Sequence, residues 1–314
     1  MEDRFIDHAI AFLRDTPSHV HRLAPAKINP KTKSSTHEMV LLLSDAHFSE
    51  VVDPRIAMGI CYNEAIAQRR LEHVRDVVLR YRQLREASYP VRKLTVAVLG
   101  DMLSGDIHEE LEISNESPMP VALVKLAYLL HDMGLSLREH FPDVEFVFIP
   151  GNHPRLSKKP RFKGKTTTNW EYVLGKFVEA LAQKSYAVTV PLAMIYVHRV
   201  FSWRLGLSHG DAVKSNSFAG IPFYGMRQRR EAIQALMRHL GEPGIDYLLL
   251  GHFHQPTVLE GTDSTIIING AIKGGDEYSL GTYLSSNDPV QYLLTFHEKH
   301  GLTDYSRINL KSVV

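Results

Sequence analysis

Two histidines near the end of the chain, His252 and His254, are the first residues whose type and spacing indicate chemistry. They follow the apolar run at 247–250 and are separated from it only by Gly251. A short apolar run that stops at a glycine is typical of a strand buried on both faces. Two imidazoles just past the end of such a strand could face one metal ion. Two histidines alone do not define a site, so other segments must supply the remaining ligands.

The same pattern, an apolar run followed at once by potential metal ligands, occurs four more times along the chain. In open α/β sheets, ligands bind beyond the carboxyl ends of the strands. The repeated pattern therefore predicts one site built from segments that are far apart in sequence. The residues that follow these four runs are Asp45 with His47, Asp101, Asn152 with His153, and His209.

The predicted ligands are imidazole nitrogens and carboxylate or amide oxygens. This mixture suits Mn, Fe or Zn better than Mg or Ca, and the absence of thiolates argues against a structural zinc site. Seven ligands are too many for one ion, so we expect two divalent ions, with Mn²⁺ as the first choice and Fe, Zn or Mg as alternatives. Asp101 is the natural bridge, because its two oxygens can contact both ions. The seven predicted ligands are Asp45, His47, Asp101, Asn152, His209, His252 and His254.

Such a pocket keeps a surplus of positive charge, because the two aspartates do not balance two dications, and it therefore attracts phosphate. In two-metal sites with ions about 3.5–4 Å apart, the metals activate a water and stabilise an in-line attack on phosphorus. We expect a metal-bridging hydroxide as the nucleophile and Asp101 as a catalytic residue. His153 follows a ligand but is not needed as one, so it is the candidate general acid that protonates the leaving oxygen.

The elements that must position these residues are strands alternating with long helices, which predicts an α/β fold. Helices are expected over about 55–87, 120–140 and 169–183. The runs before the ligands are expected to be strands, as are 192–197 and 200–207. Three later strands, at 265–269, 292–297 and 305–310, are expected to complete a second sheet.

Length and composition are those of a globular protein with 314 residues, 44% hydrophobic and 23% charged. We expect an N-terminal helix and linker over 1–36 and one catalytic domain over 37–314. The single cysteine, Cys61, fits a reducing compartment. With neither a signal peptide nor an apolar run of the roughly 20 residues that cross a bilayer, a cytoplasmic protein without a membrane partner is expected.

A basic stretch follows Asn152 and His153, and it carries Phe162 and Trp170 among its cations. Cations and aromatic rings beside such a site could hold a nucleic-acid backbone and stack its bases; the alternative is an ordinary solvated loop. His108 lies in a polar segment after Asp101 and is a further candidate. A second basic face is expected on the helix with Arg227, Arg229, Arg230 and Arg238. The candidate substrate-binding residues are Arg155, Lys158, Lys159, Arg161, Lys163 and His108.

The five motifs, taken together over residues 38 to 275, resemble those of calcineurin-like metallophosphoesterases, in that family's order. The resemblance implies a four-layer α/β/β/α sandwich of two mixed sheets flanked by helices. It also implies one ion held by Asp45, His47, Asp101 and His254, and a second held by Asp101, Asn152, His209 and His252. The motifs are Ser44-Asp45-Ala46-His47, Gly100-Asp101, Gly151-Asn152-His153, His209-Gly210 and Gly251-His252-Phe253-His254.

The basic segment after His153 and the residues 276–278 are also similar to metallophosphoesterases of tailed bacteriophages, which resemble SbcD-type DNA repair exonucleases. Two positions depart from those patterns. Pro154 stands where many members have an acid that holds the motif histidine, so we expect Asp106 or Glu109 to orient His153. Ser104 stands where the SbcD-type nucleases carry a histidine.

These observations favour a dinuclear phosphodiesterase that acts on nucleic acid, with DNA as the expected substrate and an exonuclease-like action. A phage-encoded protein would work in the host cytoplasm, and the resemblance is compatible with a homodimer. Two other classes stay open: a small-molecule nucleotide phosphatase or phosphodiesterase, and a non-catalytic binding scaffold with the same fold.

Overall fold

The structure is a computed structural model that describes residues 36–86, 88–107, 109–213, 222–283 and 286–314. The predicted N-terminal helix and nearly all of the predicted linker lie outside the described residues. His108 lies outside them as well, so its predicted role in substrate binding stays a prediction.

The first sheet has six strands in the order β11-β10-β1-β2-β3-β4. Strands β1 to β4 are parallel to one another, and β10 pairs antiparallel with β1. The parallel strands are those whose apolar runs precede predicted ligands, together with the short β4. The strands are β1 (His37–Leu43), β2 (Val91–Val98), β3 (Asp143–Phe148), β4 (Ala187–Thr189), β10 (Val290–His297) and β11 (Gly301–Asn309).

The second sheet has five strands in the order β5-β6-β7-β9-β8. Its central strands β6, β7 and β9 are parallel, while β5 and β8 pair antiparallel at the two edges. Both sheets are therefore mixed. The strands are β5 (Tyr196–Val200), β6 (Trp203–Ser208), β7 (Tyr247–Leu250), β8 (Thr257–Leu259) and β9 (Thr265–Ile268).

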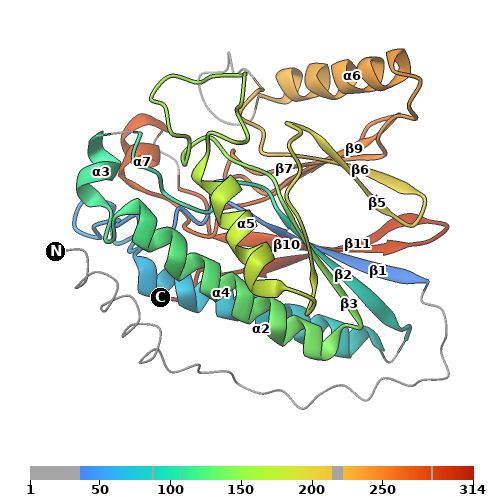
Figure 1. Ribbon diagram of the computed structural model, residues 1–314, viewed down its shortest axis with the longest axis horizontal. Helices are drawn as coiled ribbons and strands as arrows, with labels where there is room; N and C mark the ends of the chain where they lie inside the picture. Colours follow the sequence, from blue (N-terminus) through green and yellow to red (C-terminus); the bar gives the residue numbers. More distant parts are fainter. Residues whose placement is uncertain (1–35, 87, 108, 214–221, 284–285) are drawn as a thin grey trace. The chain divides into compact units, whose positions relative to one another are not determined.

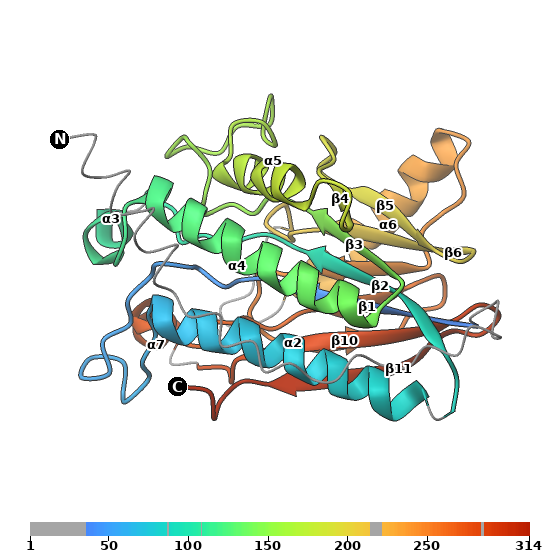
Figure 2. The same cartoon turned by 60° about the horizontal axis from the view of Figure 1, so that its bottom comes forward.

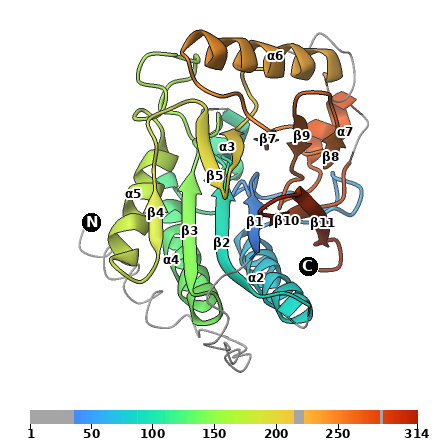
Figure 3. The same cartoon turned by 90° about the vertical axis from the view of Figure 1, so that its right-hand side faces the viewer.

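Helices cover the outer face of each sheet (Figures 1 and 2). Three helices pack on the first sheet through a core that includes Leu71, Leu126 and Leu174. The two sheets meet in a second core around Leu42 and Phe296, and one helix closes the second sheet through a third core (Figure 3). The predicted four-layer α/β/β/α sandwich is confirmed. The helices on the first sheet are α2 (Glu64–Glu86), α4 (Met119–His140) and α5 (Trp170–Ala182), and the helix on the second is α6 (Phe223–His239).

The C-terminal strands do not all join the sheet that the sequence predicted. Of the three strands predicted after His254, only β9 belongs to the second sheet, whereas β10 and β11 extend the first. All but the last residue of β10 is buried, so this strand needs a partner on both edges. Strand β1 pairs with β2 along one edge, and its other edge pairs with β10. The three strands were predicted, but two of them were assigned to the wrong sheet.

The helix predicted from residue 55 begins later, at Glu64. The residues before it form turns, and Met58 and Gly59 have positive φ angles of 52° and 89°, which a helix cannot accommodate. The side chain of Asn63 accepts a hydrogen bond from the Ile66 N–H and so begins the helix. Two short helices complete the described elements, α3 (Glu109–Ser114), whose acidic first residues are typical of a helix start, and α7 (Glu277–Tyr283), which was not predicted.

Among the described residues, α4 is the one helix whose length and apolar composition would suffice to cross a membrane. Ten of its residues are buried, and Leu126, Leu130 and Leu137 belong to the core against the first sheet. A core helix satisfies the same criteria of length and composition.

Candidate metal centre

The predicted ligands lie just beyond the carboxyl ends of β1, β2, β3, β6 and β7. Because β1 to β3 are parallel in one sheet and β6 and β7 are parallel in the other, their ends can meet at one rim. Within each sheet the backbone joins neighbouring segments, since the Asp45 N–H donates to the Gly100 carbonyl and the Gly251 N–H donates to the His209 carbonyl. Between the sheets, the His252 N–H donates to the Asp45 carboxylate at 3.1 Å. Both sheets therefore contribute to one cluster.

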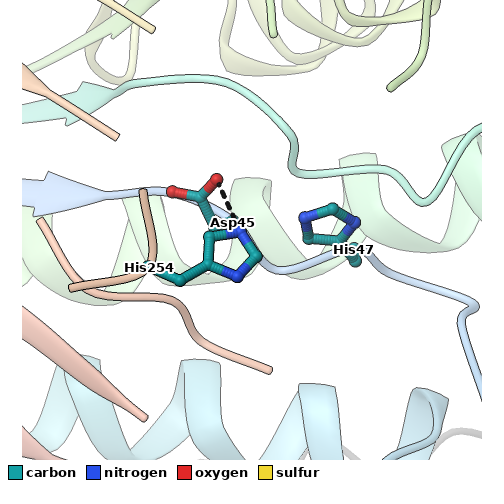
Figure 4. A group of neighbouring side chains, drawn as sticks. All are labelled: Asp45, His47 and His254. Carbon is teal, nitrogen blue, oxygen red and sulfur yellow. Dashed lines mark ion pairs between the residues drawn. The ribbon is translucent and has the colours of Figure 1, made fainter. Parts of the chain in front are cut away.

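The first group of candidate ligands comprises Asp45, His47 and His254 (Figure 4). His254 Nε2 lies 3.3 Å from Asp45 Oδ1. The His47 side chain is 1% exposed, and neither of its ring nitrogens makes a hydrogen bond among the described residues, although Glu50 Oε2 lies 3.4 Å from Nδ1. A buried imidazole without a partner is costly unless something binds it, and a metal ion would do so.

The second group comprises Asp101, His209 and His252, with Asn152 beside them. His209 Nδ1 donates to the Leu99 carbonyl at 2.7 Å. His209 Nε2 then faces three atoms at once: Asp101 Oδ2 at 3.0 Å, Asn152 Oδ1 at 3.1 Å and His252 Nδ1 at 3.2 Å.

One proton on His209 Nε2 cannot satisfy all three of these atoms. Lone pairs that converge in this way indicate a place for a cation. Ligand atoms that bind one ion at about 2.0–2.2 Å lie roughly 3 Å or slightly more from one another. The donor set therefore fits a divalent metal, and Asp101, which also belongs to a group with His47 and His153, lies between the two groups.

The protonation equilibria of the cluster agree with this arrangement. Burial is the main cause that lowers the pKa of His47 well below its usual value and the pKa of His252 to about 4, so both rings are neutral as metal ligands must be. Burial also disfavours the charged form of His209, but its contact with Asp101 prevails and raises the pKa to about 10. A metal at this position would have to displace that proton, so binding there depends on pH.

Three glycines are required at the points where the segments cross. A Cβ added to Gly151 would lie 2.1 Å from Asp101 Oδ1, and one added to Gly100 would lie 2.6 Å from the Gly151 nitrogen. A Cβ on Gly251 would come within 2.8 Å of Asp45 Oδ2. Any larger residue would push the ligand loops apart.

Five of the seven predicted ligands adopt the left-handed backbone conformation. This conformation costs an L-residue about 1–2 kcal/mol, although aspartate and histidine adopt it more readily than most residues. Such strain concentrates at functional sites, where the surrounding structure enforces it. The five residues are Asp45 (φ 55°), His47 (43°), Asp101 (50°), His252 (70°) and His254 (55°).

His153 lies against both groups, with its ring centroid 4.5 Å from that of His47. Its backbone N–H donates to Asp101 Oδ1 at 2.8 Å, and its Nδ1 lies 3.2 Å from the Ser104 carbonyl oxygen. A backbone carbonyl thus orients the ring, where the sequence suggested the carboxylate of Asp106 or Glu109. Proton exchange between this ring and a substrate would therefore involve Nε2.

A buried carboxylate that the sequence analysis missed, Glu171, joins the second and third ligand loops. Its two oxygens accept the N–H groups of Met102 and Gly151, each next to a predicted ligand. Burial, and then the charge of Asp101, raise the pKa of Glu171 to about 8. Asn169 caps α5 and donates to the Gly151 carbonyl, so the start of α5 fixes the spacing of these loops.

The predicted substrate-binding residues divide into two kinds. The Arg155 guanidinium donates to the backbone carbonyls of Asn152, Ser157 and Lys158, so it stabilises the loop and is not free for substrate. The neighbouring cations are exposed, and Lys158 lies 3.4 Å from Glu109 in a contact open to solvent. The exposed cations are Lys158, Lys159, Arg161 and Lys163.

Comparison with known proteins adds little at the level of sequence, since the chain matches no protein-family model and no curated protein. Vps29 of Entamoeba histolytica, solved with zinc, is 14% identical over 87% of this chain and 99% of that one, with a TM-score of 0.35. An archaeal phosphodiesterase is 10% identical over 86% and 99%, with a TM-score of 0.37. A Streptococcus pneumoniae protein described as a predicted phosphoesterase is 11% identical over 88% and 99%, with a TM-score of 0.33. At these TM-scores the similarities carry no argument about activity.

Replacing Glu171 with Gln should destabilise the fold and weaken metal binding. The amide offers one oxygen where two N–H groups need acceptors, and a buried N–H without a partner costs about 1–3 kcal/mol. Thermal unfolding in chelator and a Mn²⁺ titration would measure the two effects. Glu179→Gln is the matched control, because Glu179 lies on the same helix but is exposed and pairs with Lys176. Equal stability of the two variants would refute this role of Glu171.

Proposed function

We propose that this protein is a dinuclear metal-dependent phosphodiesterase that hydrolyses nucleic acid, with DNA as its substrate. The observation that carries the proposal is the convergence of His209 Nε2, Asp101 Oδ2, Asn152 Oδ1 and His252 Nδ1 at separations of 3.0 to 3.2 Å, measured from His209. The five motifs that resemble calcineurin-like metallophosphoesterases support metal-dependent phosphoester hydrolysis. The basic segment after His153 and the residues 276–278, which are similar to those of tailed-bacteriophage metallophosphoesterases, support nucleic acid as the substrate.

Two divalent ions, with Mn²⁺ as our first choice, would supply positive charge to a phosphoryl group and make water a stronger nucleophile. One ion would be held by Asp45, His47 and His254, the other by Asn152, His209 and His252, with Asp101 between them. The chain itself positions the ligands through the strained backbone at the strand ends. It leaves the rim partly open, since the His254 side chain is 25% exposed.

His153 is the proposed general acid. Its Nδ1 is directed to the Ser104 carbonyl, which keeps a proton on that nitrogen. Burial lowers the pKa of His153 in the free protein. A phosphate anion beside the ring favours the protonated form, so the ring gains its second proton as substrate binds and can then pass it to the leaving oxygen.

The exposed cations after His153 are the proposed contact to the phosphate backbone. They follow directly on the loop of Asn152, and the Arg155 hydrogen bonds hold that loop in shape. Lys165 ties its far end to Asp211, two residues beyond the ligand His209, at 2.6 Å. A strand lying on Lys158, Lys159 and Arg161 would therefore be held at a fixed distance from the ligands.

The proposed function is tested by a Mn²⁺-supplemented assay that compares single- and double-stranded DNA, RNA and small phosphate esters. We expect turnover of DNA that stops when a chelator is added. A steady preference for small esters would favour a nucleotide phosphatase instead. Purified protein that takes up no metal would exclude catalysis and favour a binding scaffold.

Replacing His153 with Asn should preserve metal content and lower turnover by about 10²–10⁴-fold. The loss should be largest for a dinucleotide and smallest for a nitrophenyl diester, because a good leaving group does not need a proton. Single-turnover rates on both esters, with metal analysis of the same samples, give the comparison. His300→Asn, an exposed histidine far along the chain, serves as the control. Full activity of the His153 variant on the dinucleotide would end its role as acid.

Replacing Lys158, Lys159 and Arg161 with Ala should weaken DNA binding and reduce its dependence on salt, since each lost phosphate contact removes about 0.9 from the slope of log K against log salt. Turnover of a small ester should not change. The matched control removes Arg80, Lys184 and Lys299, which carry the same charges and are exposed. Titrations at several salt concentrations would measure both triple variants. An equal effect of the two would rule out the loop as the DNA contact.

A further inference from the structure

A buried ion cluster lies beside the first group of candidate ligands, and no step proposed above uses it. Lys273 Nζ lies 2.7 and 2.8 Å from the two oxygens of Glu50 and also contacts Asp276. The side chains of Lys273 and Glu50 are 3% and 6% exposed. A buried charge cluster costs desolvation, and apolar residues of similar volume often stabilise a fold equally well. Stability alone therefore does not explain why this one is here.

The cluster is joined to the ligands on two sides. Glu50 Oε2 lies 3.4 Å from His47 Nδ1, which is within ion-pair distance but does not have the geometry of a hydrogen bond. The Ile272 and Lys273 N–H groups donate to the Asp45 carbonyl at 3.1 and 3.3 Å. The loop that carries Lys273 follows β9, which is parallel to β7, so it starts at the carboxyl edge where the ligands lie.

We propose that Glu50 is a positioning residue for the first metal ion. When the ion binds, the negative charge of Glu50 beside Nδ1 would favour the remaining proton of His47 on that nitrogen and leave Nε2 for the ion, while Lys273 holds both Glu50 oxygens in place. Residues that hold a ligating histidine in this way commonly change metal affinity 10- to 100-fold when they are replaced. The inference rests on the two-ion site of the proposed function but not on its substrate.

Asp276 provides a control within the same cluster. It contacts Lys273 as Glu50 does, but its other oxygen accepts the Ser279 N–H at 2.6 Å, and it makes no described contact with His47. Glu50→Gln and Asp276→Asn each remove one negative charge from the same lysine. A merely electrostatic or structural role predicts similar effects of the two variants, whereas positioning predicts that only Glu50→Gln disturbs His47.

The experiment is a calorimetric Mn²⁺ titration of the full chain, with thermal unfolding in chelator on the same samples. We expect wild type to bind two ions. Glu50→Gln should weaken one of them 10- to 100-fold and spare the other. Asp276→Asn should leave both affinities near the wild-type values. Glu50→Asp keeps the charge but withdraws the oxygen from His47, so it should weaken the binding of the same ion. It provides a second test of the contact in case the Gln variant does not fold.

To identify the weakened ion, Asn152→Ala is added to Glu50→Gln. Because Asn152 is a candidate ligand of the second ion, the double variant should also lose the remaining tight binding. Unchanged affinities in Glu50→Gln, or equal losses in Glu50→Gln and Asp276→Asn, would overturn the positioning role and leave the proposed function intact. A wild-type protein that binds no Mn²⁺ would overturn the proposed function, and the inference with it.

Discussion

The close approach of backbone segments around Asp101 is the constraint on which the rest of the site depends. Its Oδ1 accepts the His153 N–H, and its Oδ2 faces His209. This is geometrically feasible only because Gly100 and Gly151 have no side chains at the crossing point. Glu171 then holds the two loops together from beneath by accepting an N–H from each. The candidate ligands Asn152 and His209 lie around this junction.

The strain at the rim explains why the ligands sit at the ends of buried strands and not on freer loops. A residue such as Asp45 or His252 stays in the left-handed conformation only if its surroundings over-determine it. The apolar runs before the ligands provide this rigidity, since Leu41, Leu42 and Leu249 are fully buried in the cores on either side of the sheets. The same hydrophobic packing that forms the sandwich therefore maintains a backbone that would relax if the strand ends were loose.

The order of strands and ligands could be predicted from the sequence because each pairing of an apolar run with a polar residue is local. What could not be predicted depends on contacts between distant parts of the chain. Glu50 and Lys273 lie 223 residues apart, and nothing near either residue indicates a partner. The prediction that β10 belongs to the second sheet was wrong for the same reason, since the pattern that identifies a strand does not specify which strand lies beside it. The loop after β9 carried an accessible signal that was only partly used: residues 276–278 were noted, but Lys273, which follows a further strand that ends at the same rim, was not.

The basic loop shows how charge and structure divide within one segment. All its cations looked equivalent in the sequence, yet Arg155 is committed to three backbone carbonyls and Lys165 to Asp211. These two residues fix the shape of the loop, and the cations between them remain in solvent. A rigid loop loses less conformational entropy when a polyanion binds than a flexible one does. If the loop binds a phosphate backbone as proposed, Arg155 and Lys165 would support that contact by keeping the loop in shape, without touching the phosphate. Replacement of the exposed cations alone would then separate binding from folding.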